Sequence, residues 1–407
     1  MMNNTPFPWL TFLLMISFAS VNAVIPTPAL PEITHYFEIN NDQVQLLMSL
    51  YLIGYAVGQL IYGPLANRLG RKPALYVGIL VQILSNIVCI MAGVLHCFSL
   101  LPIARLFMGL GAGVGLKMAF TLVNEMCNNR IAAKRIAILV IAFAIAPGLA
   151  VGISSVILSL FSWQGCFYFA LGDGLVILIL VSRLQETLST PDNNALNISY
   201  LITKYRRQFQ NKSIIQGGVL LGCASSFIYL FATWAPFISI TGNGYSEKTF
   251  ALMNLLPTLG MLFGAITSAY LTHFFSSSFI MKLGVRFATF GVLTMLYAYI
   301  IDFSLVYSLF LPMTLINFAL SFVFANASSL ALRHCDDTSN GSAVMNFINM
   351  GMTAIIVLTI GQLPASPKLL VTGFIGISSI MALTFKIDSG ISTSLTRQAD
   401  IENNAAN

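Results

Sequence analysis

The chain has 407 residues, of which 57% are hydrophobic and only 8% are charged. A soluble domain carries roughly 25% charged residues, so this composition excludes a soluble globular protein and predicts a surface that lipid covers. The formal net charge of +6 could indicate a nucleic-acid partner, but the distribution of the cations along the chain predicts membrane topology and no nucleic acid.

Twelve stretches are apolar enough and long enough to be spanning helices, which need roughly 20 residues each. Helices are expected because open strands in lipid leave backbone groups unpaired, and no stretch alternates strictly as in a barrel. The first stretch also resembles a signal-peptide core, but no cation precedes it, so an uncleaved span is expected. The predicted spans are residues 8–30, 43–65, 74–95, 99–123, 136–161, 164–184, 214–240, 247–272, 279–301, 304–332, 341–363 and 368–387.

The cations of the chain sort between alternate loops. If the N-terminus is cytoplasmic, the loops on that side hold 16 of the 20 cations, and the opposite loops hold only Lys248 and Lys368. Basic loops stay on the cytoplasmic side of a membrane. The bias therefore predicts an even number of spans with both termini in the cytoplasm.

A polar stretch at 185–213, QETLSTPDNNALNISYLITKYRRQFQNKS, divides the spans six and six. It is expected to be a cytoplasmic linker with a short amphipathic helix near 200–209 on the membrane surface. The chain then consists of a six-helix half at 1–184, this linker, a second half at 214–387 and a tail at 388–407. A transporter built from two six-helix halves has this symmetry.

Arg105, Lys117 and Asp173 are predicted to lie deep within spans, where a charge is costly unless it is paired or hydrated. Arg105 is expected to face a cavity or a helix interface, and Lys117 either faces the cavity or extends to the cytoplasmic surface. Asp173 is the deepest carboxylate. It either carries a proton or forms a structural ion pair, with Arg105 as the obvious partner.

The loop at 63–75, GPLANRLGRKPAL, resembles the signature G-x-L-x-D-R-x-G-R-R/K-x of the major facilitator superfamily. The residues at 104–115, ARLFMGLGAGVG, and at 144–152, AIAPGLAVG, resemble the fourth- and fifth-helix patterns of that family. Three further stretches resemble the Bcr/CflA-type drug-efflux branch of that family: IPTPALPEI at 25–33, FSWQGCFYF, and RLQETL at 183–188. The glycine pairs Gly109/Gly113 and Gly111/Gly115 additionally predict close helix packing.

This resemblance implies an all-α membrane protein with twelve transmembrane helices in two six-helix bundles. It also implies a monomer in the bacterial inner membrane that couples small-molecule transport to protons, with no catalytic residue, cofactor or metal. Two departures stand out. Asn67 replaces the usual aspartate of the signature, and the region around Asn22 lacks the acid that the family often carries in helix 1.

The signature loop is expected to form a gate, although its cations could serve only to anchor it to anionic headgroups. Glu125 is expected to pair there with Arg68, Arg130 or Lys134. The predicted gating residues are Gly63, Asn67, Arg68, Gly70, Arg71, Lys72, Glu125 and Pro147.

The resemblance places a cavity among helices 1, 2, 4 and 5 and helices 7, 8, 10 and 11. Polar and aromatic side chains at helical spacing support this placement, although each alone is also explained by contacts between helices. The predicted substrate and ion pathway comprises Asn22, Tyr51, Tyr55, Gln59, Arg105, Lys117, Asp173, Trp234 and Asn346.

The expected function is secondary active export of small amphipathic compounds by alternating access. One alternative is transport of a specific anionic metabolite such as a siderophore, which the cations Arg105 and Lys117 would favour. A membrane sensor that does not transport is another. The sequence has no HExxH, GxSxG or Walker A motif, so no enzyme is expected.

Overall fold

The computed structural model describes residues 7–333, 335 and 337–384, and this part of the chain contains helices and no strands. Twelve helical segments in it are long and apolar enough to cross a membrane. Their ends agree with the predicted spans to within about four residues, except that the first span runs on to Tyr36. The expected all-helical membrane fold is therefore confirmed, while the predicted tail at 388–407 lies outside the described residues.

Six spans precede the polar stretch. The first contains α1 (Trp9–Val24), η1 (Thr27–Ala29) and α2 (Leu30–Tyr36), and the second contains α3 (Asn41–Val44) and α4 (Leu46–Leu69). The next four are α5 (Arg71–Val94), α6 (Leu100–Ala112) with α7 (Val114–Met126), α8 (Asn129–Leu160) and α9 (Gln164–Ser182).

Six further spans follow α10 (Ile198–Phe209). They are α11 (Lys212–Pro236) with η2 (Phe237–Thr241), α12 (Glu247–Leu271), α13 (Ser277–Ile300), η3 (Val306–Phe310) with α14 (Leu311–Leu332), and α15 (Thr338–Gly361). The last is the helix Pro367–Thr384.

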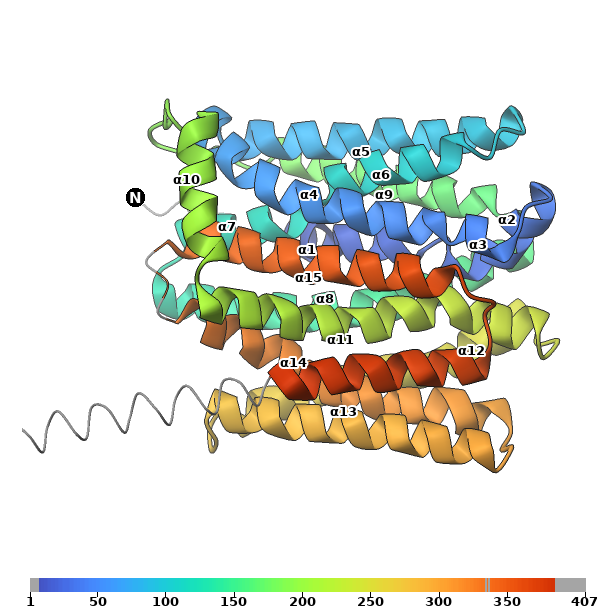
Figure 1. Cartoon of the computed structure of the whole chain (residues 1–407). Helices are drawn as coiled ribbons and strands as arrows, with labels where there is room; N and C mark the ends of the chain where they lie inside the picture. Colours follow the sequence, from blue (N-terminus) through green and yellow to red (C-terminus); the bar gives the residue numbers. More distant parts are fainter. Residues whose placement is uncertain (1–6, 334, 336, 385–407) are drawn as a thin grey trace, which may run out of the picture.

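The two sets of spans lie side by side with their axes roughly aligned (Figure 1). In that view α5 lies at one edge of the molecule and α13 at the other. Helix α4 packs on α15 and α8 packs on α12, so these pairs join the two sets. Helix α10 lies across one end, roughly perpendicular to the spans (Figure 1).

Glycines allow close approach between the helices of the first set, as the small-residue pairs predicted. A Cβ at Gly109 would overlap the backbone carbonyl of Tyr51, and one at Gly113 would lie 3.0 Å from the Cα of Gly58. Because lipid provides little drive for helices to associate, such backbone contact is a main source of packing energy in a membrane.

The signature loop is shorter than the sequence predicted. Helix α4 continues through Pro64 to Leu69, and the chain reverses at Gly70 alone, where φ is +111°. Glycine adopts this backbone conformation without steric cost. The start of α5 is capped from the linker, because the Glu186 carboxylate accepts hydrogen bonds from the backbone N–H groups of Arg71 and Lys72 at 2.9 and 3.0 Å.

Candidate functional site

A cavity of about 1250 Å³ lies between the two sets of six spans. Its walls come from α1, α4, α7 and α8 on one side and from α11, α12, α14 and α15 on the other. The cavity reaches the end of the molecule that carries the basic loops, where Asn67, Arg71 and Glu125 lie at its wall. It is large enough for a drug-sized molecule.

The opposite end of the cavity, called here the outer end, is closed by a contact between the two sets of spans. The indole Nε1 of Trp234 in α11 donates a hydrogen bond to Oε1 of Gln45 at 3.2 Å, and both side chains are buried. Gln45 also lies against Gly361 of α15. The cavity is therefore open toward the basic loops and closed toward the outer end.

About half of the residues predicted for the pathway and gate line this cavity. The lining residues are Tyr55, Gln59, Gly63, Asn67, Arg71, Lys117, Glu125, Pro147 and Asn346. The other predicted residues do not line the cavity. Trp234 lies at the outer end, and Arg68, Gly70 and Lys72 lie beside the linker. The remaining four, which are packed among the helices of the first set, are Asn22, Tyr51, Arg105 and Asp173.

Arg105 is fully buried at a helix interface, which was one of its two predicted locations, and it forms no ion pair with Asp173, which was one of the two alternatives for that carboxylate. Its guanidinium donates instead to the backbone carbonyls of Asn22 at 2.6 Å, Ala23 at 2.8 Å and Leu47 at 3.1 Å, and it lies over the Tyr51 ring. The Asn22 carbonyl has no intrahelical hydrogen-bond donor, because the residue four positions later is a proline, which has no N–H. Arg105 thus holds the irregular end of α1 against α4.

Asp173 contacts neutral amides. Its Oδ2 accepts a hydrogen bond from Nδ2 of Asn22 at 3.4 Å, and Nε2 of Gln82 donates to Oδ1 of Asn22 at 2.8 Å. No cation among the described residues lies within ion-pair distance of Asp173. The carboxylate in α9 is therefore joined to α1 and α5 by amides alone.

Arg71 forms the centre of the gate cluster, which also contains Glu125 and Asn67. Its Nη2 lies 2.7 Å from Oε1 of Glu125, and its Nη1 donates to Oδ1 of Asn67 at 2.7 Å. Asn67 thus acts as a neutral acceptor where the family has an acid, and Glu125 supplies the negative charge.

The predicted partners of Glu125 were wrong for the described residues. Arg68 donates instead to Oδ1 of Asn193 in the linker. Lys134 forms no described ion pair with Glu125, and the side chain of Arg130 lies outside the described residues.

The linker contacts the signature loop at the end of the molecule that carries the basic loops. Thr187 donates to Glu125, and the backbone N–H of Asp192 donates to the carbonyl of Asn67 at 3.0 Å. Partial burial alone would raise the pKa of Glu186, but bonds from the backbone N–H groups of Leu188, Arg71, Lys72 and Thr187 lower this pKa overall. The loop is thus bound on one side by its own half and on the other by the linker.

Helix α10 contacts both sets of spans. The Tyr205 hydroxyl donates to the carbonyl of Leu60 in α4 at 2.6 Å. On the other side, Nζ of Lys204 lies 3.8 Å from Oδ2 of Asp337 at the start of α15. This helix therefore links the two halves at the open end of the cavity.

Several cavity residues were not predicted. Asn254, Thr258, Met261 and Ser268 of α12 line the wall. Their spacing of three, four and seven residues places them on one face of a helix. A search for polar residues at helical spacing within this apolar span would have found Asn254, Thr258 and Ser268.

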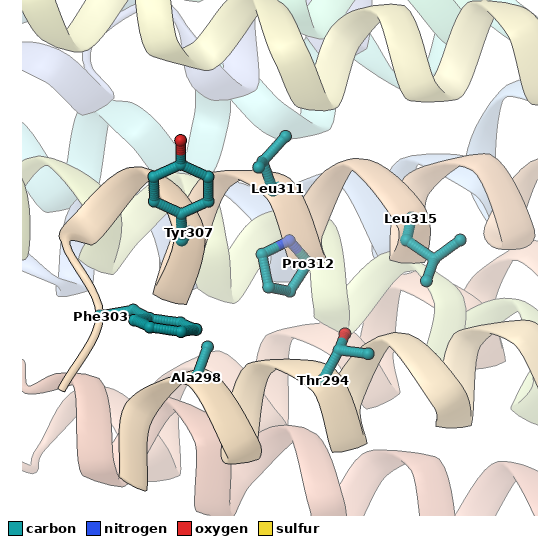
Figure 2. A pocket seen from close by; sticks show the side chains of 7 residues that line it. All are labelled: Thr294, Ala298, Phe303, Tyr307, Leu311, Pro312 and Leu315. Carbon is teal, nitrogen blue, oxygen red and sulfur yellow. The ribbon is translucent and has the colours of Figure 1, made fainter. Parts of the chain in front are cut away.

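A second, smaller hollow of about 280 Å³ lies between α13 and α14 (Figure 2). The seven residues that line it carry no charge, and Tyr307 and Phe303 are exposed. Exposed apolar side chains are what a spanning helix presents to lipid. This hollow is therefore a weaker candidate than the central cavity.

Comparison with known proteins relates the chain to membrane transporters. The model of the Major Facilitator Superfamily matches residues 10–357. Multidrug resistance protein D of Escherichia coli (strain K12) is 25% identical over 260 residues, covering 63% of this chain and 64% of its own length. The MFS-type transporter YdgK of Bacillus subtilis (strain 168) is 23% identical over 368 residues, covering 88% of this chain and 90% of its own.

A solved structure of the xylose transporter XylE from E. coli, in a partially occluded inward-open conformation, has a similar fold. The TM-score is 0.74 with 13% sequence identity, over 93% of this chain and 95% of XylE. At this identity the likeness concerns the fold alone.

Proposed function

The chain belongs to the major facilitator superfamily, and on that premise we propose that it is a secondary active transporter that exports small amphipathic compounds by alternating access. The observation that carries this proposal is the cavity between the halves, open at the basic end and closed by Gln45 and Trp234 at the other. Such a cavity is what one end state of alternating access requires. Relatives named as multidrug resistance proteins support small compounds as the substrates.

The cavity wall suits compounds with an apolar body. Aromatic and aliphatic side chains such as Phe120, Leu221 and Phe324 alternate there with amides such as Asn317 and Asn346. Mostly apolar walls with a few polar groups are typical of small-molecule sites. We take the halves at 1–184 and 214–387 to be the units that move, with the linker at 185–213 between them, in a protein that acts as a monomer.

Proton coupling is assigned to Asp173 in this proposal. An ionisable group inside a span that pairs with no cation is a functional candidate by default. Asp173 meets that condition among the described residues, and its amide contacts reach α1, whose residue Val24 lines the cavity. Protonation of Asp173 could thus alter the packing of α1 against the cavity.

The test is dye flux in proteoliposomes with an imposed pH gradient. The wild-type protein should drive a fluorescent amphipathic dye uphill, whereas Asp173→Asn should lose uphill transport and keep downhill exchange. Asp302→Asn, in an exposed loop, is the matched control and should behave as wild type. Uphill flux that survives Asp173→Asn would refute the coupling role, and no flux of any kind would refute transport.

The proposed orientation puts both termini and the basic loops in the cytoplasm of a bacterium, with the protein in the inner membrane. Lys204 in α10 and Lys248 in α12 then face opposite sides of the bilayer. An impermeant amine reagent applied to intact cells should modify Lys248 and spare Lys204. Modification of both from one side would contradict this topology.

A further inference from the structure

Lys117 is an uncompensated cation in the wall of the central cavity. Its Nζ is buried, and it has no hydrogen-bond partner or carboxylate partner among the described residues. The ammonium lies directly against Gly63, where a Cβ would overlap it. A buried charge without a partner is costly, and an anionic group that enters the cavity would lower this cost.

Gln59 is a second weakly bound polar group on the same wall. Its side chain is 1% exposed, and its amide makes no close hydrogen bond among the described residues, with only a looser interaction to the Tyr55 hydroxyl one turn earlier in α4. It also lines the cavity, and it precedes Gly63 by four residues, which is one helical turn. The amide of Gln59 and the ammonium beside Gly63 therefore lie one turn apart along α4.

The described carboxylates nearest the open end are already bound. Glu125 is held by Arg71 and Thr187. Asp337 caps α15, accepts a hydrogen bond from Nδ2 of Asn340 at 2.7 Å and lies 3.8 Å from Nζ of Lys204. Neither carboxylate is the partner of Lys117 in this state, so the charge is available to a ligand.

We propose that Lys117 and Gln59 form an anion subsite that binds the carboxylate of a small amphipathic substrate. The ammonium would bind one carboxylate oxygen and the Gln59 Nε2–H group the other, because both are donors and neither makes a close hydrogen bond among the described residues. The apolar body of the substrate would then lie against Phe120 and Phe324 in the same cavity. This inference rests on the proposed function and names its substrate class as amphipathic monocarboxylates.

Three probes of the same shape and different charge test the subsite. Binding of 2-naphthoate, 2-naphthamide and 2-naphthylmethylammonium to the purified full chain in detergent is measured by calorimetry, without any gradient. The naphthoate should bind about tenfold more tightly than the amide, the size expected for a charge-assisted hydrogen bond. Naphthylmethylammonium should bind weakest.

Variants then assign the preference to the subsite. Lys117→Met should remove the tenfold preference and leave the affinity for the amide unchanged, which also shows that the variant is folded. Lys117→Arg should keep the preference. Gln59→Glu should abolish naphthoate binding and raise the melting temperature, because the new carboxylate would pair with the buried ammonium. Lys368→Met removes an exposed cation at the outer end and is the matched control.

The outcomes separate this inference from the transport proposal. Naphthoate that binds no more tightly than the amide, or that binds Lys117→Met as tightly as wild type, would overturn the subsite even if dye flux is intact. Naphthoate bound through Lys117 without any flux in liposomes would support the subsite and refute transport.

Discussion

At Arg71 one guanidinium binds a carboxylate and an amide at once, with 2.7 Å to both Glu125 and Asn67. Replacing Glu125 by glutamine should leave this partly buried cation without a counter-charge and lower the free energy of unfolding by about 1–2 kcal/mol. Adding Asn67→Asp should restore most of the loss, because the new carboxylate would lie within reach of Nη1. Thermal unfolding of both single variants and the double variant measures the coupling.

The control for this cycle is Asn67→Asp in the wild-type background, where Glu125 already balances Arg71. It should change the stability less than it does in the Glu125→Gln background. A double variant as unstable as Glu125→Gln alone would show that the two acceptors do not substitute for one another.

The sequence predicted which polar residues lie deep in the spans, but it did not predict which groups they contact. Depth alone identified Arg105 as a residue needing compensation, and the structure supplies it with backbone carbonyls. Two of these acceptors, the carbonyls of Asn22 and Ala23, are available because α1 ends before Pro26, so the position of a helix end decided most of the contact. Gln45 was missed because a single glutamine at the start of a span has no periodic signal.

At the scale of elements, the linker caps α5 through Glu186. The pKa of this carboxyl is lowered in the folded protein, so its stabilisation is fully present above the unfolded pKa near 4.5 and is lost as the pH falls through the folded pKa. Glu186→Gln should therefore cost about 1 kcal/mol at pH 7, as for a lost helix cap. The melting curves of variant and wild type should converge at acidic pH.

The control for the linker is Glu38→Gln, which removes an exposed carboxylate at the opposite end of the molecule. It should change the melting temperature at pH 7 less than Glu186→Gln does. A constant gap between Glu186→Gln and wild type from pH 7 to the acid limit would show that the effect does not come from titration of Glu186.

Elements were largely predictable because apolar length determines a span. The amphipathic helix expected near 200–209 is found at Ile198–Phe209. The continuation of α4 to Leu69 was not predicted, because a short run of polar and basic residues between two apolar stretches is typical of irregular backbone. Contacts of the linker with the signature loop join an irregular segment to helix ends more than 100 residues away in the sequence, and no periodic pattern encodes them.

At the scale of the molecule, composition and the sorting of cations were enough to predict twelve helices in two bundles. They could not predict which end of the cavity is closed, because both end states of a transporter share one sequence and one pattern of spans. Only the contacts between the halves, at Trp234 and Gln45 on one end and across α10 on the other, distinguish the state.

The closed outer end depends on the hydrogen bond between Trp234 and Gln45. Weakening this bond should shift the equilibrium toward conformations in which the outer end is open. Trp234→Phe keeps an aromatic ring but removes the donor to Gln45, a loss of about 1 kcal/mol or a roughly fivefold change in the population ratio. Spin labels at the exposed Cys97 and at Asn243→Cys, with the other accessible cysteines replaced by serine, report the outer distance. A longer distance should become more populated in Trp234→Phe and in Gln45→Leu alike, because either change breaks the same hydrogen bond. Identical distance distributions in both variants and the parent would show that this bond does not hold the outer end closed.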